Sequence, residues 1–167
     1  MIATGQTLPA GKLMESTSFD EGTGCPIAPQ EVDVISASKD KKIVIFGLPG
    51  AYTPTCSAKH VPSFIHNADA LRAKGVDEVW CVTTNDAFVM AAWGKQLKVD
   101  GKVRMLADGS AQYVKLLGLD LDLTARGMGV RSNRYAMIVD HGVVKGVYVE
   151  EPGKFDVSSA EAVLKHL

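Results

Sequence analysis

The residue best suited to carry out chemistry is Cys56, which lies in the segment Pro49-Gly50-Ala51-Tyr52-Thr53-Pro54-Thr55-Cys56-Ser57. This segment follows a short β-branched run, and the apolar residues after Pro54 adopt helical spacing. Threonine suits the N-cap of a helix and proline its first position, so a helix should begin here with Cys56 at its third position. The sulfur of Cys56 would then lie near the unpaired N–H groups and the positive end of the helix dipole.

A thiol in this position needs further help to become a nucleophile. A free thiol with a pKa near 8.5 is only about 3% thiolate at pH 7, and the thiolate is the reactive form. Lowering the pKa to about 6, so that the thiolate is dominant, takes about 3.4 kcal/mol of stabilisation of the thiolate relative to the thiol. A position in the first turn of a helix supplies about 1 kcal/mol of this. Thr53 offers a hydroxyl, and the cation that we expect beside Cys56 is Arg134, at the entry of a predicted strand. Arg131, on the preceding loop, is the alternative cation or a support for Arg134.

Each of these residues also has an ordinary structural explanation. A single cysteine near a helix start is more often an inert, partly buried residue. An arginine at a strand edge is usually a solvated charge or half of a weak ion pair. The combination of Thr53, Pro54 and Cys56 directly after Pro49-Gly50 is what favours the chemical interpretation.

The other cysteines point less clearly to a role. Cys81 lies in the middle of an apolar run, where a buried structural cysteine is the simplest interpretation. Cys25 lies in a Gly-rich segment that we expect to be an exposed loop, and no role is assigned to it. No group of His and Cys residues has the spacing of a zinc site, so no metal is predicted.

Length and composition restrict the class of protein. The chain has 167 residues, 46% of them hydrophobic, which predicts one domain over residues 1–167 with a sizeable core. Its net charge is −1, without the basic excess of a nucleic-acid binder. Three cysteines disfavour a secreted disulfide framework, and residues 1–6 do not resemble a secretory signal. The longest purely apolar stretch, 43–46, is too short to cross a membrane. We therefore expect a soluble, cytoplasmic protein.

The first half of the chain predicts a hairpin followed by a βαβ unit. Apolar pieces at 10–14 and 32–35 flank a Gly-rich stretch, which indicates an N-terminal hairpin or two edge strands. Strands are predicted at 43–48 and 76–84. The helix between them should be kinked at Pro62, because the proline ring meets the carbonyl of Ala58.

The second half predicts three helices, a third parallel strand and a hairpin. A helix at 87–97 should be capped by Asp86, and a strand should follow at 103–107. Ser110 should cap a brief helix that ends at Gly118. Strands at 134–139 and 143–149 should form a tight hairpin. Ser158 and Glu161 form a capping-box pattern for a last helix that runs to Leu167.

This order of elements predicts an α/β fold. A right-handed crossover and helices on both faces of a mixed central β-sheet match a thioredoxin-like sandwich, with an N-terminal strand or hairpin extension and an insertion before the second hairpin. The fold alone does not give a function.

The motif that carries more information is Pro-x3-Thr-x2-Cys, formed by Pro49, Thr53 and Cys56. It resembles the active-site motif of the peroxiredoxins. The longer string 49–57, followed by Lys59-His60-Val61-Pro62-Ser63-Phe64, resembles the atypical type II branch, which includes the plant type II proteins. The resemblance continues through 84–93 and 131–139, so it covers essentially the whole domain.

The resemblance implies a thiol-dependent peroxidase that reduces hydrogen peroxide and small organic hydroperoxides without metal, haem or flavin. Cys56 would be the peroxidatic nucleophile, oxidised to a sulfenic acid. Thr53 would hydrogen-bond the thiolate and the peroxide, and Arg134 would stabilise the thiolate and the developing negative charge.

The resemblance also implies secondary roles at the same site. Pro49 would shield the sulfur from water, and the backbone N–H groups of Gly50 and Cys56 would bind the peroxide. His60, one turn beyond Cys56, would have a supporting role. A homodimer that forms through the active-site face is implied as well.

Recycling of oxidised Cys56 stays open between two routes. Cys81 matches the resolving cysteine of the plant-type members, but a disulfide needs Cα atoms within about 7 Å, so the first helical turn would have to unwind. We therefore favour an external thiol, either glutathione with glutaredoxin or thioredoxin, and a structural role for Cys81.

Two other functions remain as alternatives. A thiol–disulfide oxidoreductase would have the same fold, but Cys56 has no partner in a C-x-x-C motif. A redox-sensing or interaction module would react with peroxide once instead of turning over.

Overall fold

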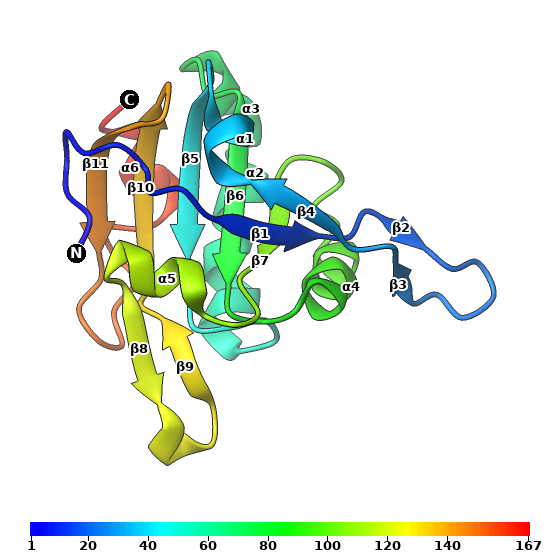
Figure 1. The fold of residues 1–167 in the computed structure, drawn as a ribbon. Coiled ribbons are helices and arrows are strands. Elements are labelled where there is room, and N and C mark those ends of the chain that lie inside the picture. Colours follow the sequence, from blue (N-terminus) through cyan, green and yellow to red (C-terminus); the bar gives the residue numbers. More distant parts are fainter.

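The computed structural model describes residues 1–167 and centres on a seven-stranded mixed sheet with the order β11-β10-β5-β6-β7-β1-β4 (Figure 1). The neighbouring strands β5, β6 and β7 run parallel, and the flanking strands pair antiparallel to them. The thioredoxin-like mixed sheet that the sequence predicted is confirmed. The strands are β1 (Lys12–Glu15), β4 (Gln30–Asp33), β5 (Lys42–Gly47), β6 (Glu78–Thr83), β7 (Arg104–Ala107), β10 (Tyr135–Asp140) and β11 (Val143–Val149).

Helices cover both faces of this sheet and enclose two apolar layers. Alternate residues of β5 point into different layers: Val44 and Phe46 pack on one side, and Ile43 and Ile45 on the other. This period of two is what a central strand buried on both faces requires. The first layer contains Cys56 and is covered by α2 (Val61–His66), α3 (Ala68–Ala73), α4 (Ala87–Leu97) and α6 (Ala160–Leu164); α1 (Val34–Ser38) and α5 (Gln112–Leu117) cover the second.

The helical segment after Pro54 differs from the single kinked helix that the sequence predicted. Helical backbone begins at Pro54 and continues as a π-helix, Cys56–His60, in which the Val61 N–H bonds the carbonyl of Cys56. The wider turn lies directly before Pro62, which has no N–H to donate. A second break at Asn67, with φ −103°, separates α2 from α3.

Of the predicted caps, Asp86 and Gly118 are confirmed, whereas Ser110 and Ser158 are wrong. Asp86 caps α4 and accepts the Val89 N–H, as predicted. Ser110 lies too early to cap α5; Asp108 instead accepts the backbone N–H groups of Tyr113 and Val114, at 3.0 and 2.8 Å.

The last helix also begins one residue later than the capping-box pattern indicated. Ser159, not Ser158, accepts the Ala162 N–H, and α6 ends at Leu164. The side chain of Ser158 is buried and bonds Glu150, so it is not free to cap the helix.

The N-terminal hairpin is confirmed, since β1 pairs antiparallel with β4 along the edge of the sheet. Its two strands are extended by β2 (Ser18–Phe19) and β3 (Pro26–Ile27), which project from the edge of the sheet in Figure 1. The predicted insertion is a second hairpin, β8 (Asp120–Leu123) and β9 (Gly129–Ser132). It projects beyond the end of the sheet toward which β5 and β6 run.

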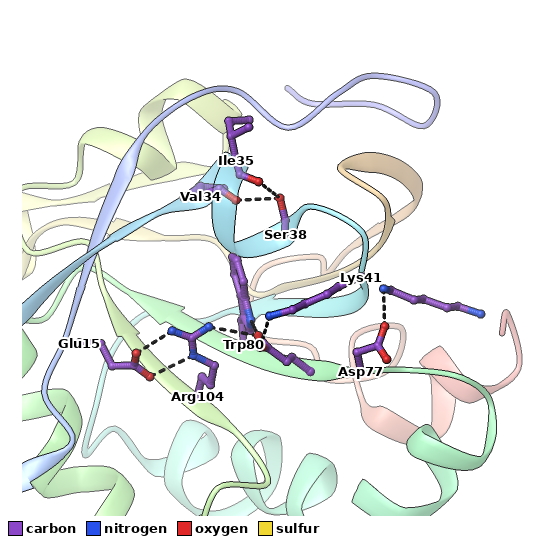
Figure 2. A network of polar contacts seen from close by, with 10 residues as sticks. Glu15, Val34, Ile35, Ser38, Lys41, Asp77, Trp80 and Arg104 are labelled. Carbon is purple, nitrogen blue, oxygen red and sulfur yellow. Dashed lines mark hydrogen bonds and ion pairs between the residues drawn. The ribbon is translucent and has the colours of Figure 1, made fainter.

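A polar network joins Glu15, at the end of β1, to Arg104 and Glu78, which begin β7 and β6 (Figure 2). Arg104 bonds both carboxylate oxygens of Glu15, at 3.1 and 2.7 Å, and bonds Glu78 at 3.1 Å. Glu78 also accepts bonds from Lys41 and from the indole N–H of Trp80. Because Glu78 and Arg104 begin β6 and β7, this network lies away from the segment that contains Cys56.

The longest helix, α4, has 11 residues, and none of the helices combines the length and apolar character that a bilayer crossing would require.

Candidate active site

The register of the sheet brings the Cys56 segment and Arg134 to the same place. β10 runs antiparallel to β5, and its first residue, Tyr135, is paired with Gly47, the last residue of β5. The chain that leaves β5 toward Cys56 therefore starts beside the chain that enters β10. Arg134, directly before Tyr135, lies at this junction.

The guanidinium of Arg134 reaches the sulfur of Cys56. Its Nη2 donates a hydrogen bond to Sγ at 3.3 Å, and Cys56 is fully buried. A guanidinium carries its charge at all physiological pH values, and reactive cysteines are characteristically found beside such a cation. The structure thus places Arg134 where the sequence predicted a cation.

His60 connects Arg134 to the C-terminal segment. Arg134 Nη1 lies 2.9 Å from Nδ1 of His60, and Nε2 of His60 lies 2.9 Å from the carbonyl oxygen of Ser158. A guanidinium only donates and a carbonyl only accepts, so the ring proton is on Nε2 and Nδ1 accepts from Arg134.

The ring of His60 is also held in its neutral form. Burial, and second the positive charge of Arg134, lower the pKa of His60 to about 3. A neutral ring with its proton on Nε2 keeps the Nδ1 lone pair directed at Arg134. His60 therefore accepts a hydrogen bond from the guanidinium and orients it, while the His60 ring itself stays uncharged.

Thr53 has a different hydrogen bond from the one predicted. Its hydroxyl donates to the carbonyl of Gly50 at 2.8 Å, so its side chain does not cap the helix or contact the sulfur in this structure. Its carbonyl accepts the N–H of Ser57 at 3.0 Å, which is the bond expected of an N-cap backbone. The hydroxyl oxygen has used its proton and is left as an acceptor.

Arg131 fixes the loop that precedes Cys56. Its Nη1 donates to the carbonyl of Pro49 at 3.2 Å and its Nε to that of Met128 at 2.7 Å. A side chain at Gly50 would collide with Arg131 Nη1, so glycine leaves room for this contact. Arg131 thus supports the loop, and Arg134 is the cation that contacts Cys56.

An open cleft of about 660 Å³ lies against these residues, with Pro49, Thr53 and Arg134 in its wall. The β8–β9 hairpin contributes apolar side chains to it, and the segment after β11 contributes polar ones. Sequence reasoning did not place either segment at the site. The alternation of Leu and Asp over 119–123 was the available signal for β8, but nothing local indicated its location. The added lining residues include Leu121, Leu123, Arg126 and Met128 from the hairpin, and Glu150, Glu151 and Lys154 from the segment after β11.

The remaining cysteines lie in different surroundings. Cys81 is fully buried in the same apolar layer as Cys56, on β6 opposite Phe46. Burial, and second the charge on Cys56, raise the pKa of Cys81 well above its ordinary value. Cys25 is exposed between β2 and β3, and all three cysteines are free. No group of three or more His, Cys, Asp or Glu side chains is arranged to hold a metal ion.

The family model and the named relatives point to one family, although one similar structure carries the name of another enzyme. The family model described as Redoxin matches residues 3–164. Peroxiredoxin-2B of Arabidopsis thaliana is 48% identical over 99% of this chain and 98% of its own. Reduced Prx3 of Vibrio vulnificus, solved in complex with hydrogen peroxide, is 46% identical, with a TM-score of 0.90 over 99% of each chain. A Burkholderia cenocepacia structure named for a thioredoxin reductase is 55% identical, with a TM-score of 0.93 over 100% of this chain and 98% of its own.

Proposed function

This chain belongs to the Redoxin family and is a peroxiredoxin, a thiol-dependent peroxidase, and within that activity we propose that Cys56 is the peroxidatic residue. The observation that carries the proposal is the 3.3 Å contact between Arg134 Nη2 and Cys56 Sγ. It supplies the cation that a buried thiolate needs, next to the only cysteine in the motif segment 49–57.

The proposed oxidation step uses these side chains, the peroxide and one proton from the solvent. The Cys56 thiolate attacks one oxygen of the hydroperoxide, a new S–O bond forms, and the O–O bond breaks. The departing oxygen takes the electron pair and the proton of the attacked O–H group and leaves as water or an alcohol. The sulfenate left on Cys56 then takes one proton from the solvent and becomes a sulfenic acid. Arg134 stabilises the negative charge first on sulfur and then on the departing oxygen.

The surrounding groups would hold the peroxide for this attack. Because the hydroxyl of Thr53 donates to Gly50, its oxygen is free to accept the O–H of a hydroperoxide. The backbone N–H groups of Gly50 and Cys56 are the proposed donors to the peroxide oxygens. Pro49, in the wall of the cleft, would limit access of water to the sulfur.

We assign hydrogen peroxide and small organic hydroperoxides as substrates. The Vibrio vulnificus relative was solved with hydrogen peroxide, which supports the smaller substrate. The cleft of about 660 Å³ with leucines on the β8–β9 hairpin leaves space for a short alkyl group. The test is turnover of hydrogen peroxide and tert-butyl hydroperoxide in parallel, with glutathione plus glutaredoxin or with thioredoxin. A single stoichiometric reaction with no turnover under any reductant would favour a sensor.

Reduction by an external thiol is the proposed second half of the cycle. Cys81 lies inside the sheet and its raised pKa keeps it as an unreactive thiol. For Cys81 to form a disulfide with Cys56, the π-helix in which Cys56 is buried would have to unfold. A small thiol could instead enter by the cleft that borders Thr53 and Arg134.

The proposed assembly is a homodimer formed through the active-site face. Tyr52 and Phe88 are exposed by 52% and 50%; Tyr52 lies in the segment that leads to Cys56, and Phe88 lies in the first turn of α4. Light scattering of the wild type and of Tyr52→Asp would test this assembly. We also propose a cytoplasmic location, which cell fractionation would test.

A further inference from the structure

Glu150 is a buried carboxylate whose hydrogen bonds fold the segment after β11. It is 9% exposed, and one of its oxygens, Oε1, accepts the N–H of Asp156 at 2.7 Å and the N–H of Ser158 at 2.8 Å. The same oxygen accepts the hydroxyl of Ser158 at 2.8 Å. Glu150 forms no ion pair, and its own N–H bonds the carbonyl of Arg134 at 2.9 Å.

The segment that Glu150 organises is the one that holds His60. The carbonyl of Ser158 lies 2.9 Å from Nε2 of His60. One turn further along the helix, the hydroxyl of Ser63 donates to the His60 carbonyl at 2.8 Å and accepts the Ala160 N–H at 3.2 Å. Both the ring and the backbone of His60 are therefore fastened to residues 158–160.

We propose that Glu150 is a positioning residue for the peroxidase reaction, acting through Ser158 and His60 on Arg134. By fixing Ser158, Glu150 keeps a carbonyl opposite Nε2 of His60 and so keeps the ring proton on that nitrogen. The Nδ1 lone pair then accepts a hydrogen bond from Nη1 of Arg134, and Nη2 of the same guanidinium donates to the sulfur of Cys56. This inference rests on the proposed roles of Arg134 and Cys56.

The physical reason is that a long arginine side chain has several rotamers. It must be held in one of them if its guanidinium is to stay hydrogen-bonded to the sulfur of Cys56. If Ser158 moves, the proton of His60 is free to occupy Nδ1, where it faces an N–H of Arg134. Two donors then face each other, and the guanidinium turns away from the sulfur.

The experiment compares Glu150→Ala with Glu150→Gln and Asp156→Asn. Alanine removes the acceptor of three hydrogen bonds, whereas glutamine retains an amide oxygen at the same place. Asp156→Asn removes an acidic side chain from the same segment, but that side chain is exposed and its backbone N–H is unchanged, which makes it the matched control.

Three readouts separate positioning from general stability. The ¹⁵N shifts of the His60 ring report its tautomer independently of activity. The pH dependence of Cys56 alkylation reports stabilisation of the thiolate, and stopped-flow kinetics report peroxide reduction. In Glu150→Ala we expect mixed His60 tautomers, alkylation displaced to higher pH and at least tenfold slower reduction. Glu150→Gln should stay within about threefold of the wild type, and Asp156→Asn should match it.

The inference is overturned if folded Glu150→Ala keeps the wild-type tautomer and alkylation profile, whatever its melting temperature. If Glu150→Ala does not fold, Ser158→Ala provides the same readouts, since it removes one of the three bonds and should displace the alkylation profile in the same direction. A failure of the Cys56 assignment would look different, because peroxide reduction would then survive Cys56→Ser while the His60 tautomer still responded to Glu150.

Discussion

Arg134 donates a hydrogen bond to Cys56 across 78 positions of sequence, at 3.3 Å between Nη2 and Sγ. The contact exists because β10 returns antiparallel to β5 and pairs Tyr135 with Gly47. A change in the register of this strand pair would move Arg134 away from the sulfur, so the chemistry depends directly on the central sheet.

Cys56→Ser should abolish peroxide turnover, because a hydroxyl at this position does not form the anion that attacks the O–O bond. Cys25→Ser is the matched control, since Cys25 is exposed on the N-terminal extension, and it should stay within a few fold of the wild type. Steady-state peroxide consumption with an excess of reductant measures both. Wild-type turnover by Cys56→Ser would refute the assignment.

Arg134→Ala should slow peroxide reduction at least about tenfold, which corresponds to about 1.4 kcal/mol of barrier. Alkylation of Cys56 should also require higher pH in this variant, because the thiolate loses its adjacent cation. Arg134→Lys should recover only part of the rate, because an ammonium lacks the two separate nitrogens with which the guanidinium bonds His60 and Cys56 at the same time. An alkylation profile that is unchanged in Arg134→Ala would show that another group stabilises the sulfur.

The stability of the protein should fall as the pH falls below about 6.5, in part because of His60. The unfolded chain binds a proton at His60 near pH 6.5, whereas the folded chain binds it only near pH 3. Between these values the unfolded state holds more protons, so the free energy of unfolding rises with pH, by up to about 1.4 kcal/mol per unit from this group. Urea unfolding of wild type and His60→Phe between pH 4 and 7 should show a shallower dependence in the variant. His66→Phe, at an exposed position, should keep the wild-type slope.

One equivalent of peroxide without reductant should leave the monomer heavier by about 16 mass units, as a sulfenic acid on Cys56. Addition of glutathione should convert this species to a mixed disulfide. Intact-mass spectrometry measures both products. A monomer lighter by two mass units, absent in Cys81→Ser, would instead identify Cys81 as the resolving cysteine.

Asp108→Ala should destabilise the protein by about 1–2 kcal/mol, because the first N–H groups of α5 lose their acceptor. Ser110→Ala should change the free energy of unfolding by less than about 0.5 kcal/mol, since no hydrogen bond of its side chain holds the helix. Denaturant unfolding at pH 7 compares the two variants. A larger effect of Ser110→Ala would restore the cap that the sequence pattern indicated.

Local patterns were enough to locate the central elements of the fold. The apolar runs at β5, β6 and β7, the cap of α4 at Asp86 and the tight β10–β11 turn all depend on residues close together in sequence. The caps at Ser110 and Ser158 were predicted wrongly because a distant or neighbouring group made a better bond. Asp108 reaches the N–H groups of α5 from the end of β7, and Glu150 occupies the hydroxyl of Ser158.

The sequence by itself singled out Cys56 as the candidate nucleophile and located the start of its helix, because Pro49, Thr53, Pro54 and Cys56 lie close together in the chain. Only the tertiary structure decided that Arg134 contacts the sulfur while Arg131 holds the Pro49 loop. It also decided the tautomer of His60, through a carbonyl 98 positions away. A hydrogen bond depends on distance and direction in space, and for residues far apart in sequence these are set by strand register and by the path of the C-terminal segment.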